Sequence, residues 1–276
     1  MKKTTFLALL CLFSFLIPSI TSACSVLYYI DAKTGKIYVV NNEDYYFDVK
    51  AYIQIEPKTK KKYARLWYGW DNFAQGGINE KGLFFDGAVT PKQQKIKGYK
   101  NPKNNLGDKL LAKCATVEEA IAFLEKEKIA LNTSHIMFGD KTGKAVVVEW
   151  INGEKKLNWI QDNKLIMTNY LLSKPDEGNF PCYRYKNIEN SIAEMEKSSE
   201  EINLRKVGNT LGRAAQLPVK TTDGKTGGTL YTTFIDITDN KFALSYKLSN
   251  TNVFLLDLNE EFAKSKRKKI KLKDMK

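Results

Sequence analysis

The chain has 276 residues, of which 44 are lysine or arginine and 31 are aspartate or glutamate, so its formal net charge is +13 at pH 7. One histidine and only three cysteines beyond residue 23 argue against a transition-metal centre, and no motif calls for a cofactor. No basic motif interleaved with aromatic residues occurs in the body of the chain, which argues against a nucleic-acid partner.

Residues 1–23 have the pattern of a secretory signal peptide. Lys2 and Lys3 are followed by an apolar run over 6–18 and by small residues up to Ala23. The apolar run is shorter than the roughly 20 residues that a membrane-spanning helix needs. We therefore expect an exported protein, periplasmic or secreted, whose remaining residues are enough for one large domain.

A cysteine lies at the predicted cleavage point. Cleavage after Ala23 would leave Cys24 as the first residue of the mature chain. The α-amine of an N-terminal residue has a pKa of about 7.7–8.0, so nucleophile and base would lie within one residue and no histidine would be needed. The alternative is a lipid on Cys24, which would make a membrane-anchored lipoprotein. Thr21 stands where lipoprotein signals usually have leucine, which favours ordinary cleavage.

The first folded segment is a predicted β-hairpin. β-Branched and aromatic residues predict strands at 25–30 and 37–40, around a turn at 31–36. Cys24 lies at the outer end of this hairpin, and the second strand delivers residues 41–44 to the same end. Further strands are predicted at 49–56, 64–68 and 83–85.

Helices and strands then alternate in blocks. Helical spacing is present over 106–114, and Thr116 with Glu119 forms a capping box that opens a second helix. Strands are predicted at 135–139, 145–150, 157–160 and 164–169, helices at 181–197 and 199–216, and strands at 229–237, 241–248 and 252–258. Because there is no regular βαβ alternation, we expect an α+β fold of two antiparallel sheets with helices packed outside.

Residues 264–276 form a lysine-rich C-terminal tail. We expect a solvated, frayed terminus, although such a charge run can also attract anionic lipid. Membrane contact is therefore expected only through this tail or through a lipid on Cys24. Cys114 and Cys182 either form a disulfide, which an exported compartment permits, or are reduced, with Cys114 packed in the core.

Several motifs occur in an order typical of one enzyme family. Cys24 with the later Asn-Asn-Glu-Asp run at 41–44 is similar to a Cys-Thr start followed by Arg-Asn-Met-Asp or Gln-Asn-Trp-Asp. Residues 77–83, 168–169 and 182–185 resemble the Gly-Met-Asn-Glu-Lys-Gly-Leu, Thr-Asn and Ser-Arg-Phe motifs. The chain thus resembles the N-terminal nucleophile (Ntn) hydrolases of the linear-amide type, which include choloylglycine hydrolases, penicillin V acylases and acid-ceramidase-like amidases. This resemblance implies a four-layer αββα sandwich over 24–263.

The resemblance implies catalytic roles for four residues. Cys24 would attack an amide carbonyl and form an acyl-enzyme that water hydrolyses. Asp44 would orient the α-amine, and Asn169 would donate to the tetrahedral oxyanion. Arg184 would hold Asp44 or the substrate through its planar fork. Without the resemblance, Asp44 and Asn169 are interpreted as turn residues and Arg184 as a surface helix residue.

Three further residues would contact substrate. Asn41 and Asn42 would form a polar wall of the site, or are only turn residues, and a backbone N–H near Val89 would be a second oxyanion donor. Asn41 stands where choloylglycine hydrolases have an arginine that would stabilise the thiolate, and the Gly-Ala-Val run at 87–89 stands in place of Gly-Leu-Asn. Both departures argue against bile salts as substrates.

Two other features have a functional and a structural interpretation. His135 could act as a papain-like base to Cys24, but no partner spacing supports this and a structural role is favoured. An aromatic group that includes Trp67, Trp70 and Phe73 either packs in the core or lines a pocket for an apolar acyl group.

The predicted function is an exported cysteine Ntn amidase that hydrolyses a small N-acyl amide in the manner of penicillin V acylase. The alternatives are an acyltransferase of the same fold and a catalytically inactive, lipid-anchored binding protein. We expect no metal, cofactor or nucleic acid, and homo-oligomerisation is left open.

Overall fold

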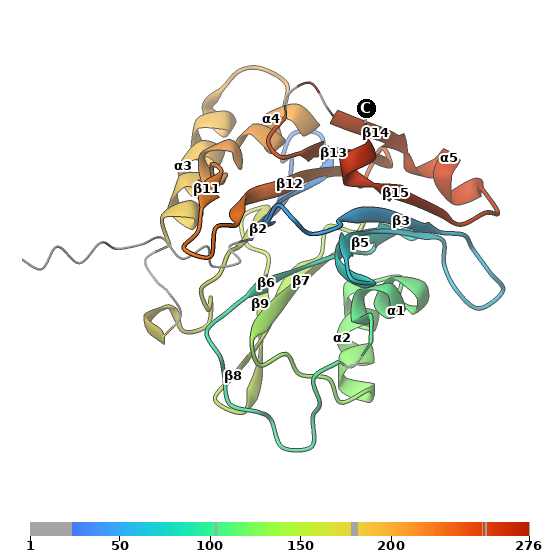
Figure 1. The fold of residues 1–276 in the computed structure, drawn as a ribbon, viewed down its shortest axis with the longest axis vertical. Coiled ribbons are helices and arrows are strands. Elements are labelled where there is room, and N and C mark those ends of the chain that lie inside the picture. The colour runs from blue at the N-terminus through green and yellow to red at the C-terminus, as the bar shows by residue number, and fades with distance from the viewer. Residues whose placement is uncertain (1–23, 103, 178–181, 250, 252, 276) are drawn as a thin grey trace, which may run out of the picture.

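The structure is a computed structural model that describes residues 24–102, 104–177, 182–249, 251 and 253–275. The predicted signal peptide, residues 1–23, lies outside the described residues. Within them, the chain forms two antiparallel sheets and two groups of helices (Figure 1).

The first sheet contains the predicted N-terminal hairpin. Its strands follow the order β10-β1-β2-β12-β13-β14, and β11 pairs with β12. Their bounds are β1 Ser25–Ile30, β2 Ile37–Tyr46, β10 Lys164–Met167, β11 Val219–Lys220, β12 Thr226–Asp236, β13 Lys241–Tyr246 and β14 Val253–Asp257. Because Ser25 is paired with Asn42, the start of β1 lies beside the 41–44 run, as the hairpin predicts.

The second sheet has the order β15-β3-β4-β5-β6-β7-β8-β9. The strands are β3 Tyr52–Glu56, β4 Arg65–Trp70, β5 Phe73–Asn79, β6 Phe84–Val89, β7 Ser134–Gly139, β8 Ala145–Ile151, β9 Glu154–Trp159 and β15 Lys268–Lys271. All its neighbouring strands are antiparallel, so short turns connect most of them.

Helices cover the outer face of each sheet. The α-helices are α1 Leu106–Lys113, α2 Val117–Lys126, α3 Tyr183–Lys197, α4 Leu204–Asn209 and α5 Leu258–Ala263, and the 3₁₀ turns are η1 Pro175–Glu177, η2 Gly212–Ala214 and η3 Leu272–Asp274. Figure 1 shows α1 and α2 on one side of the molecule and α3 and α4 on the opposite side. The predicted cap of α2 is present, since the Thr116 side chain accepts a hydrogen bond from the Glu119 amide.

Three apolar layers hold the four structural layers together. Along β1, Val26 and Tyr28 face the core between the sheets, whereas Leu27 and Tyr29 pack toward α3 and α4. This is the two-residue period of a strand buried on both faces. A third cluster joins α1 and α2 to the second sheet. The predicted α+β fold, a four-layer αββα sandwich, is confirmed.

The helix predicted over 199–216 is wrong in extent. Only α4 and the short turn η2 form there, and the Asn203 side chain caps α4 by accepting a hydrogen bond from the Lys206 amide. Asn203 starts the helix late, and the weak helix formers Gly208 and Gly212 favour an early end. The helix predicted at 181–197 begins at Tyr183, and residue 181 lies outside the described part of the chain.

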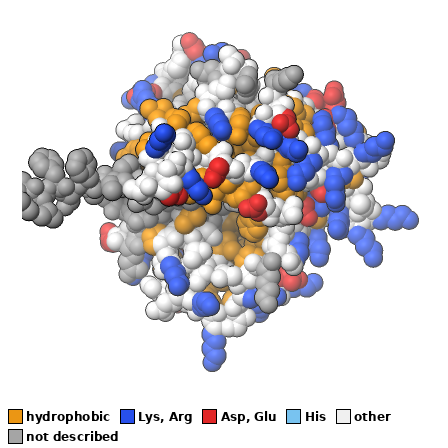
Figure 2. Space-filling model, in the orientation of Figure 1, with side chains coloured by type: hydrophobic (Ala, Val, Ile, Leu, Met, Phe, Trp, Pro, Cys, Tyr) orange, Lys and Arg blue, Asp and Glu red, His pale blue; other side chains and the backbone are white. Residues whose placement is uncertain are grey.

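The expectation of a frayed C-terminus is also wrong. Strand β15 pairs with β3, and the side chains of Ile270 and Leu272 pack against the core between the sheets. The domain therefore continues past residue 263. The reason is period-2 alternation, which places these apolar side chains inward and lysines such as Lys269 and Lys271 outward. Figure 2 shows lysine and arginine side chains gathered at the right of the view, where Figure 1 places β15 and α5.

Cys24, Cys114 and Cys182 are all free thiols in the structure. Cys114 is buried in the cluster formed by α1 and α2, whereas the sulfur of Cys182 accepts a hydrogen bond from the hydroxyl of Thr168. Of the two interpretations of Cys114, the structure contains the small apolar core residue. Among the described residues, no helix is long and apolar enough to cross a membrane.

Candidate active site

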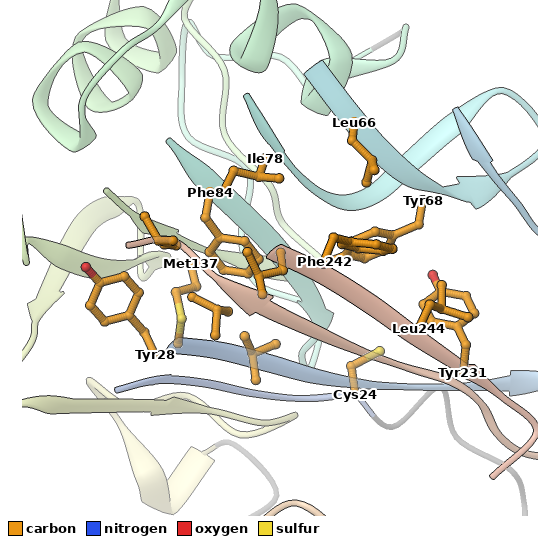
Figure 3. Close-up of a cluster of buried hydrophobic side chains, with 14 of the residues drawn as sticks. Cys24, Tyr28, Leu66, Tyr68, Ile78, Phe84, Met137, Tyr231, Phe242 and Leu244 are labelled. Carbon is orange, nitrogen blue, oxygen red and sulfur yellow. The ribbon is translucent and has the colours of Figure 1, made fainter. Parts of the chain in front are cut away.

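Cys24 lies at the end of the interface between the two sheets. It directly precedes β1, only 2% of its surface is exposed, and its side chain belongs to the core between the sheets. Figure 3 shows it near Tyr231, from its own sheet, and Tyr68, from the opposite sheet. Cys24 also lines a cavity of about 150 Å³ whose walls include Phe73, Phe85, Val89 and Leu106. The sulfur therefore meets a small, largely apolar space.

The thiol is hydrogen-bonded to a buried carboxyl group. Cys24 Sγ donates to Glu43 Oε1 at 3.2 Å. Burial, followed by the charges of Glu43, Asp44 and Asp86, raises the pKa of the Cys24 thiol well above its usual range. The group is thus a thiol in this environment, and it needs a base before it can act as a nucleophile.

Arg184 connects several of the predicted site residues. From the start of α3, its Nη1 donates to the carbonyl oxygen of Cys24 at 2.9 Å and to the hydroxyl of Ser25 at 3.2 Å. Its Nη2 donates to Asn169 Oδ1 at 2.8 Å. Nη1 is also 3.9 Å from Asp44 Oδ2. Arg184 is only 6% exposed, so it is not the surface helix residue of the alternative interpretation.

Asp44 is fully buried on β2, and one of its oxygens has no hydrogen-bond donor among the described residues. Its Oδ1 accepts a 2.5 Å hydrogen bond from the Thr229 hydroxyl, while no described residue donates to Oδ2. Burial raises the pKa of Asp44 to about 7, against the opposing effects of the Thr229 hydrogen bond and the Arg184 charge. An unpartnered buried oxygen of this kind is suited to an additional donor.

The backbone before Thr229 requires glycine. Gly228 has φ +154°, and a Cβ there would lie 2.9 Å from the carbonyl oxygen of Gln216. The same segments are joined by a hydrogen bond from the Thr229 amide to that oxygen and by one from the Gln216 amide to the Thr229 hydroxyl. This close approach fixes the hydroxyl that binds Asp44.

Asn169 and Val89 lie in contact beside the cavity. Asn169 Nδ2 donates to the carbonyl oxygen of Val89 at 2.7 Å, and Arg184 holds the Asn169 carbonyl oxygen. Val89 ends β6 with its side chain 46% exposed, whereas Asn169 follows β10 and is 8% exposed. The orientation of the Asn169 amide is therefore set by two partners from different layers.

Asn41 and Asn42 are strand residues of β2, so their interpretation as turn residues is wrong. Asn42 faces the helices, where its Nδ2 donates to the Leu211 carbonyl and its Oδ1 accepts from the Thr232 hydroxyl. These contacts give Asn42 a packing role rather than a place in a site wall. Asn41 faces the core between the sheets, and its amide has no hydrogen-bond partner among the described residues.

His135 does not bind the thiol. Its Nδ1 lies 2.9 Å from Glu149 Oε1 and its Nε2 lies 2.6 Å from the Thr168 carbonyl oxygen. Glu149 also accepts hydrogen bonds from the amides of Leu172 and Ser173. His135 and Glu149 therefore hold the two ends of the segment that carries Asn169, in agreement with the structural interpretation of His135.

Two buried carboxyl groups near Cys24 were not assigned a role from the sequence. Glu43 lies within the 41–44 run, at the place where the similar motifs have methionine or tryptophan. Asp86 lies on β6, fully buried, and accepts a 2.8 Å hydrogen bond from the Tyr68 hydroxyl. The sequence feature that could have revealed Asp86 is an acidic residue within an otherwise apolar strand, immediately after two phenylalanines.

In the described part of the chain, no group of three or more potential ligands is arranged for a metal ion.

The layer order, with a cysteine at the start of a central strand, defines the fold as that of the Ntn hydrolases. Residues 31–250 match the family described as acyl-coenzyme A:6-aminopenicillanic acid acyl-transferase. Because this match spans most of the chain, the protein belongs to that family. No curated protein sequence matches the chain.

Solved structures show the same fold. A single-residue variant of conjugated bile acid hydrolase from Clostridium perfringens is 20% identical, with a TM-score of 0.71 over 89% of this chain and 96% of that chain. Penicillin V acylase from Agrobacterium tumefaciens is also 20% identical, with a TM-score of 0.69 over 89% of this chain and 90% of that chain. The N-acylethanolamine-hydrolyzing acid amidase ortholog from Caenorhabditis elegans is 12% identical, with a TM-score of 0.56 over 89% of this chain and 99% of that chain.

Proposed function

We propose that the mature protein begins at Cys24 and is an exported amidase that hydrolyses a small linear N-acyl amide through an acyl-enzyme. The observation that carries this proposal is the set of Arg184 contacts, which join the Cys24 carbonyl to Asn169 and lie beside Asp44. Removal of residues 1–23 would create the α-amine that Cys24 needs as a base. Export to the periplasm or the exterior is part of the same proposal.

In the proposed reaction, Cys24 transfers its proton to its own α-amine, directly or through a water molecule. The thiolate adds to the amide carbonyl, the C–N bond breaks as the amine leaves with a proton, and water then hydrolyses the thioester. Asp44 Oδ2, which accepts no hydrogen bond from the described residues, supports a role in orienting the ammonium group. Asn169 would donate to the oxyanion, where one such donor contributes about 3–4 kcal/mol.

The cavity favours a compact apolar acyl group. Its volume of about 150 Å³ is comparable to that of apolar cavities that hold a benzene-sized molecule. Phe73, Phe85 and Leu106 supply apolar walls, and no described lysine or arginine lines it. A phenoxyacyl or short aliphatic acyl group would therefore suit it better than a steroid. This agrees with the departures at Asn41 and at 87–89.

The description of the matched family favours one second candidate, an acyltransferase of the same fold. In that case an amine rather than water would attack the thioester at Cys24. Titrating an amine acceptor into the reaction separates the two, since a transferase gives a transfer product that saturates with acceptor and replaces the free acid, whereas a hydrolase gives mainly free acid.

The proposal is tested with the processed protein and a panel of phenoxyacyl, aliphatic acyl and bile-acid amides. We expect phenoxyacyl amides to turn over, a thioester to form on the Cys24 peptide after rapid quenching, and Cys24→Ala to lower kcat/KM by about 10³-fold or more. Cys114→Ala, which removes a thiol from the α1 and α2 cluster, is the matched control and should retain activity. Absence of turnover by the wild type with every amide would contradict the proposal.

A further inference from the structure

The side chains of β2 divide the site between two faces of one sheet. Asn42 and Asp44 face the helices, where Asp44 meets Thr229 and Arg184. Asn41 and Glu43 face the other way, into the space that holds the Cys24 sulfur. The arginine expected from the family resemblance at position 41 would have lain on this inner face. Here, the thiol meets the Glu43 carboxyl group instead.

The inner face has no described cation to balance this carboxyl. Glu43 is 2% exposed, and Asp86, from the opposite sheet, is fully buried. The described residues whose charges act on these two groups are acidic or neutral. Burying two carboxylates in such a space without a counter-charge is costly, so they retain protons instead.

Titratable groups from several elements surround Glu43 in the described part of the chain. They are Cys24 on β1, Asp44 on β2, Tyr68 on β4, Asp86 on β6, His135 on β7, Tyr231 on β12 and, beyond Asp44, Arg184 on α3. Burial raises the pKa of Glu43 to about 8; its contact with the thiol opposes the shift, and the Asp44 charge adds to it. Asn41 and Tyr231 favour the charged form, but neither forms a hydrogen bond of normal length with Glu43. At neutral pH Glu43 thus carries a proton.

We propose that neutral Glu43 is a catalytic residue that donates a hydrogen bond to the Cys24 thiolate, in the role of the arginine absent from position 41. This rests on the proposed function of Cys24. In the resting state the thiol donates to Glu43 Oε1. When Cys24 gives its proton to the α-amine, the Glu43 O–H turns to the negative sulfur. It shares this proton with the sulfur until the S–C bond forms, and the proton then stays on Glu43 because a thioester sulfur is no longer basic. Because Glu43 Oε2 has no partner among the described residues, the carboxyl group is free to present its O–H.

The same contact becomes unfavourable when Glu43 ionises. A carboxylate 3.2 Å from the sulfur would repel the thiolate and hold the proton on the thiol. The α-amine must lose its proton for activity, and Glu43 must keep one. These two requirements predict a bell-shaped dependence of kcat/KM on pH, with the alkaline limb belonging to Glu43.

The test measures two quantities between pH 5 and 10 on the processed protein. One is kcat/KM for a phenoxyacyl amide, and the other is the rate of Cys24 alkylation by iodoacetamide, followed by mass mapping of the Cys24 peptide. The variants are Glu43→Gln, which cannot ionise but can still donate, and Glu43→Met, which can do neither. Asp236→Asn changes a buried carboxyl at the far end of β12 and is the control.

We expect Glu43→Gln to lose the alkaline limb of the kcat/KM profile. At pH 9 it should also be alkylated about tenfold faster than wild type, because loss of the Glu43 charge should lower the pKa of the Cys24 thiol by roughly one unit. Glu43→Met should have lower kcat/KM at every pH, and Asp236→Asn should follow the wild type. A wild-type kcat/KM that rises steadily through pH 9, or identical profiles for wild type and Glu43→Gln, would overturn the inference.

The two proposals fail in different ways. If Cys24 is not an amidase nucleophile, no acyl-enzyme will form, yet alkylation will still depend on Glu43 as stated. If acylation proceeds normally while alkylation and turnover ignore Glu43, only the inference fails. Should Glu43→Gln not fold, the alkaline limb of the wild type alone remains decisive, since its absence contradicts the role of a neutral Glu43.

Discussion

The guanidinium group of Arg184 lies 2.9 Å from the carbonyl oxygen of Cys24 and, through its other terminal nitrogen, 2.8 Å from Asn169. One buried side chain from α3 therefore positions the backbone of the proposed nucleophile and the proposed oxyanion donor together. A planar fork with several fixed donors can do this, whereas a single ammonium group cannot.

This geometry predicts the effect of Arg184→Lys. The lysine keeps the charge but cannot reach Cys24, Ser25 and Asn169 together, so we expect kcat/KM to fall by roughly 10²-fold. We also expect the free energy of unfolding to fall by about 3 kcal/mol, because buried partners lose their donor. Urea unfolding and steady-state kinetics measure the two effects. Arg213→Lys, at an exposed ion pair with Glu194, should change neither by more than about 0.5 kcal/mol.

The buried carboxyl groups predict that stability decreases as pH rises. Burial raises the pKa of Glu43 to about 8 from 4.5, so the folded protein holds a proton that the unfolded chain loses between these values. The folded state is favoured below this window and loses that advantage across it. In a Cys24→Ala background, adding Glu43→Gln should make the decrease in unfolding free energy with pH less steep, by up to roughly 1.4 kcal/mol per pH unit. Urea unfolding at pH 5.5, 6.5 and 7.5 measures this, and an unchanged slope would argue against a neutral Glu43.

The hydrogen bonds of His135 predict a loss of stability rather than of a catalytic base. In His135→Gln, buried Glu149 loses its 2.9 Å contact with His135 Nδ1, which costs about 1–3 kcal/mol. Turnover by the folded fraction should stay within about tenfold of wild type, because Arg184 and Val89 still hold Asn169. Thermal unfolding and kcat, measured on the same preparation, check both statements. Complete loss of activity in a stable variant would revive the papain-like alternative.

The final strand predicts that the C-terminal segment stabilises the domain. Leu272 is 1% exposed in the core between the sheets, so Leu272→Ala should lower the free energy of unfolding by about 2–5 kcal/mol. Lys273→Ala, at the neighbouring position, should cost no more than about 0.5 kcal/mol. Chemical denaturation of both variants provides the comparison. Equal stability would mean that β15 contributes little to the fold.

Much of this architecture could be predicted from the sequence because the strands are apolar and local turns connect them. The β1 and β2 hairpin and the start of α2 at Thr116 follow from short-range patterns. The motif order pointed to Cys24 and Arg184, which the structure brings together across 160 residues.

The remaining features depend on tertiary contacts. The alternation of β2 separates Asn41 from Asn42, but which face is inward depends on how β12 pairs with β2. Asp86 meets the Cys24 region only because the two sheets pack face to face. The lysine-rich tail becomes a strand because β3 offers it an edge. Charge alone predicted a frayed end.

The identity of the mature N-terminus tests the central claim most directly. Intact-mass and N-terminal peptide analysis should be made on protein recovered from an exporting host. We predict a chain that begins at Cys24 with an unmodified α-amine. A chain that retains residues 1–23, or that carries a lipid on Cys24, would lack the free amine or the free thiol and would contradict it.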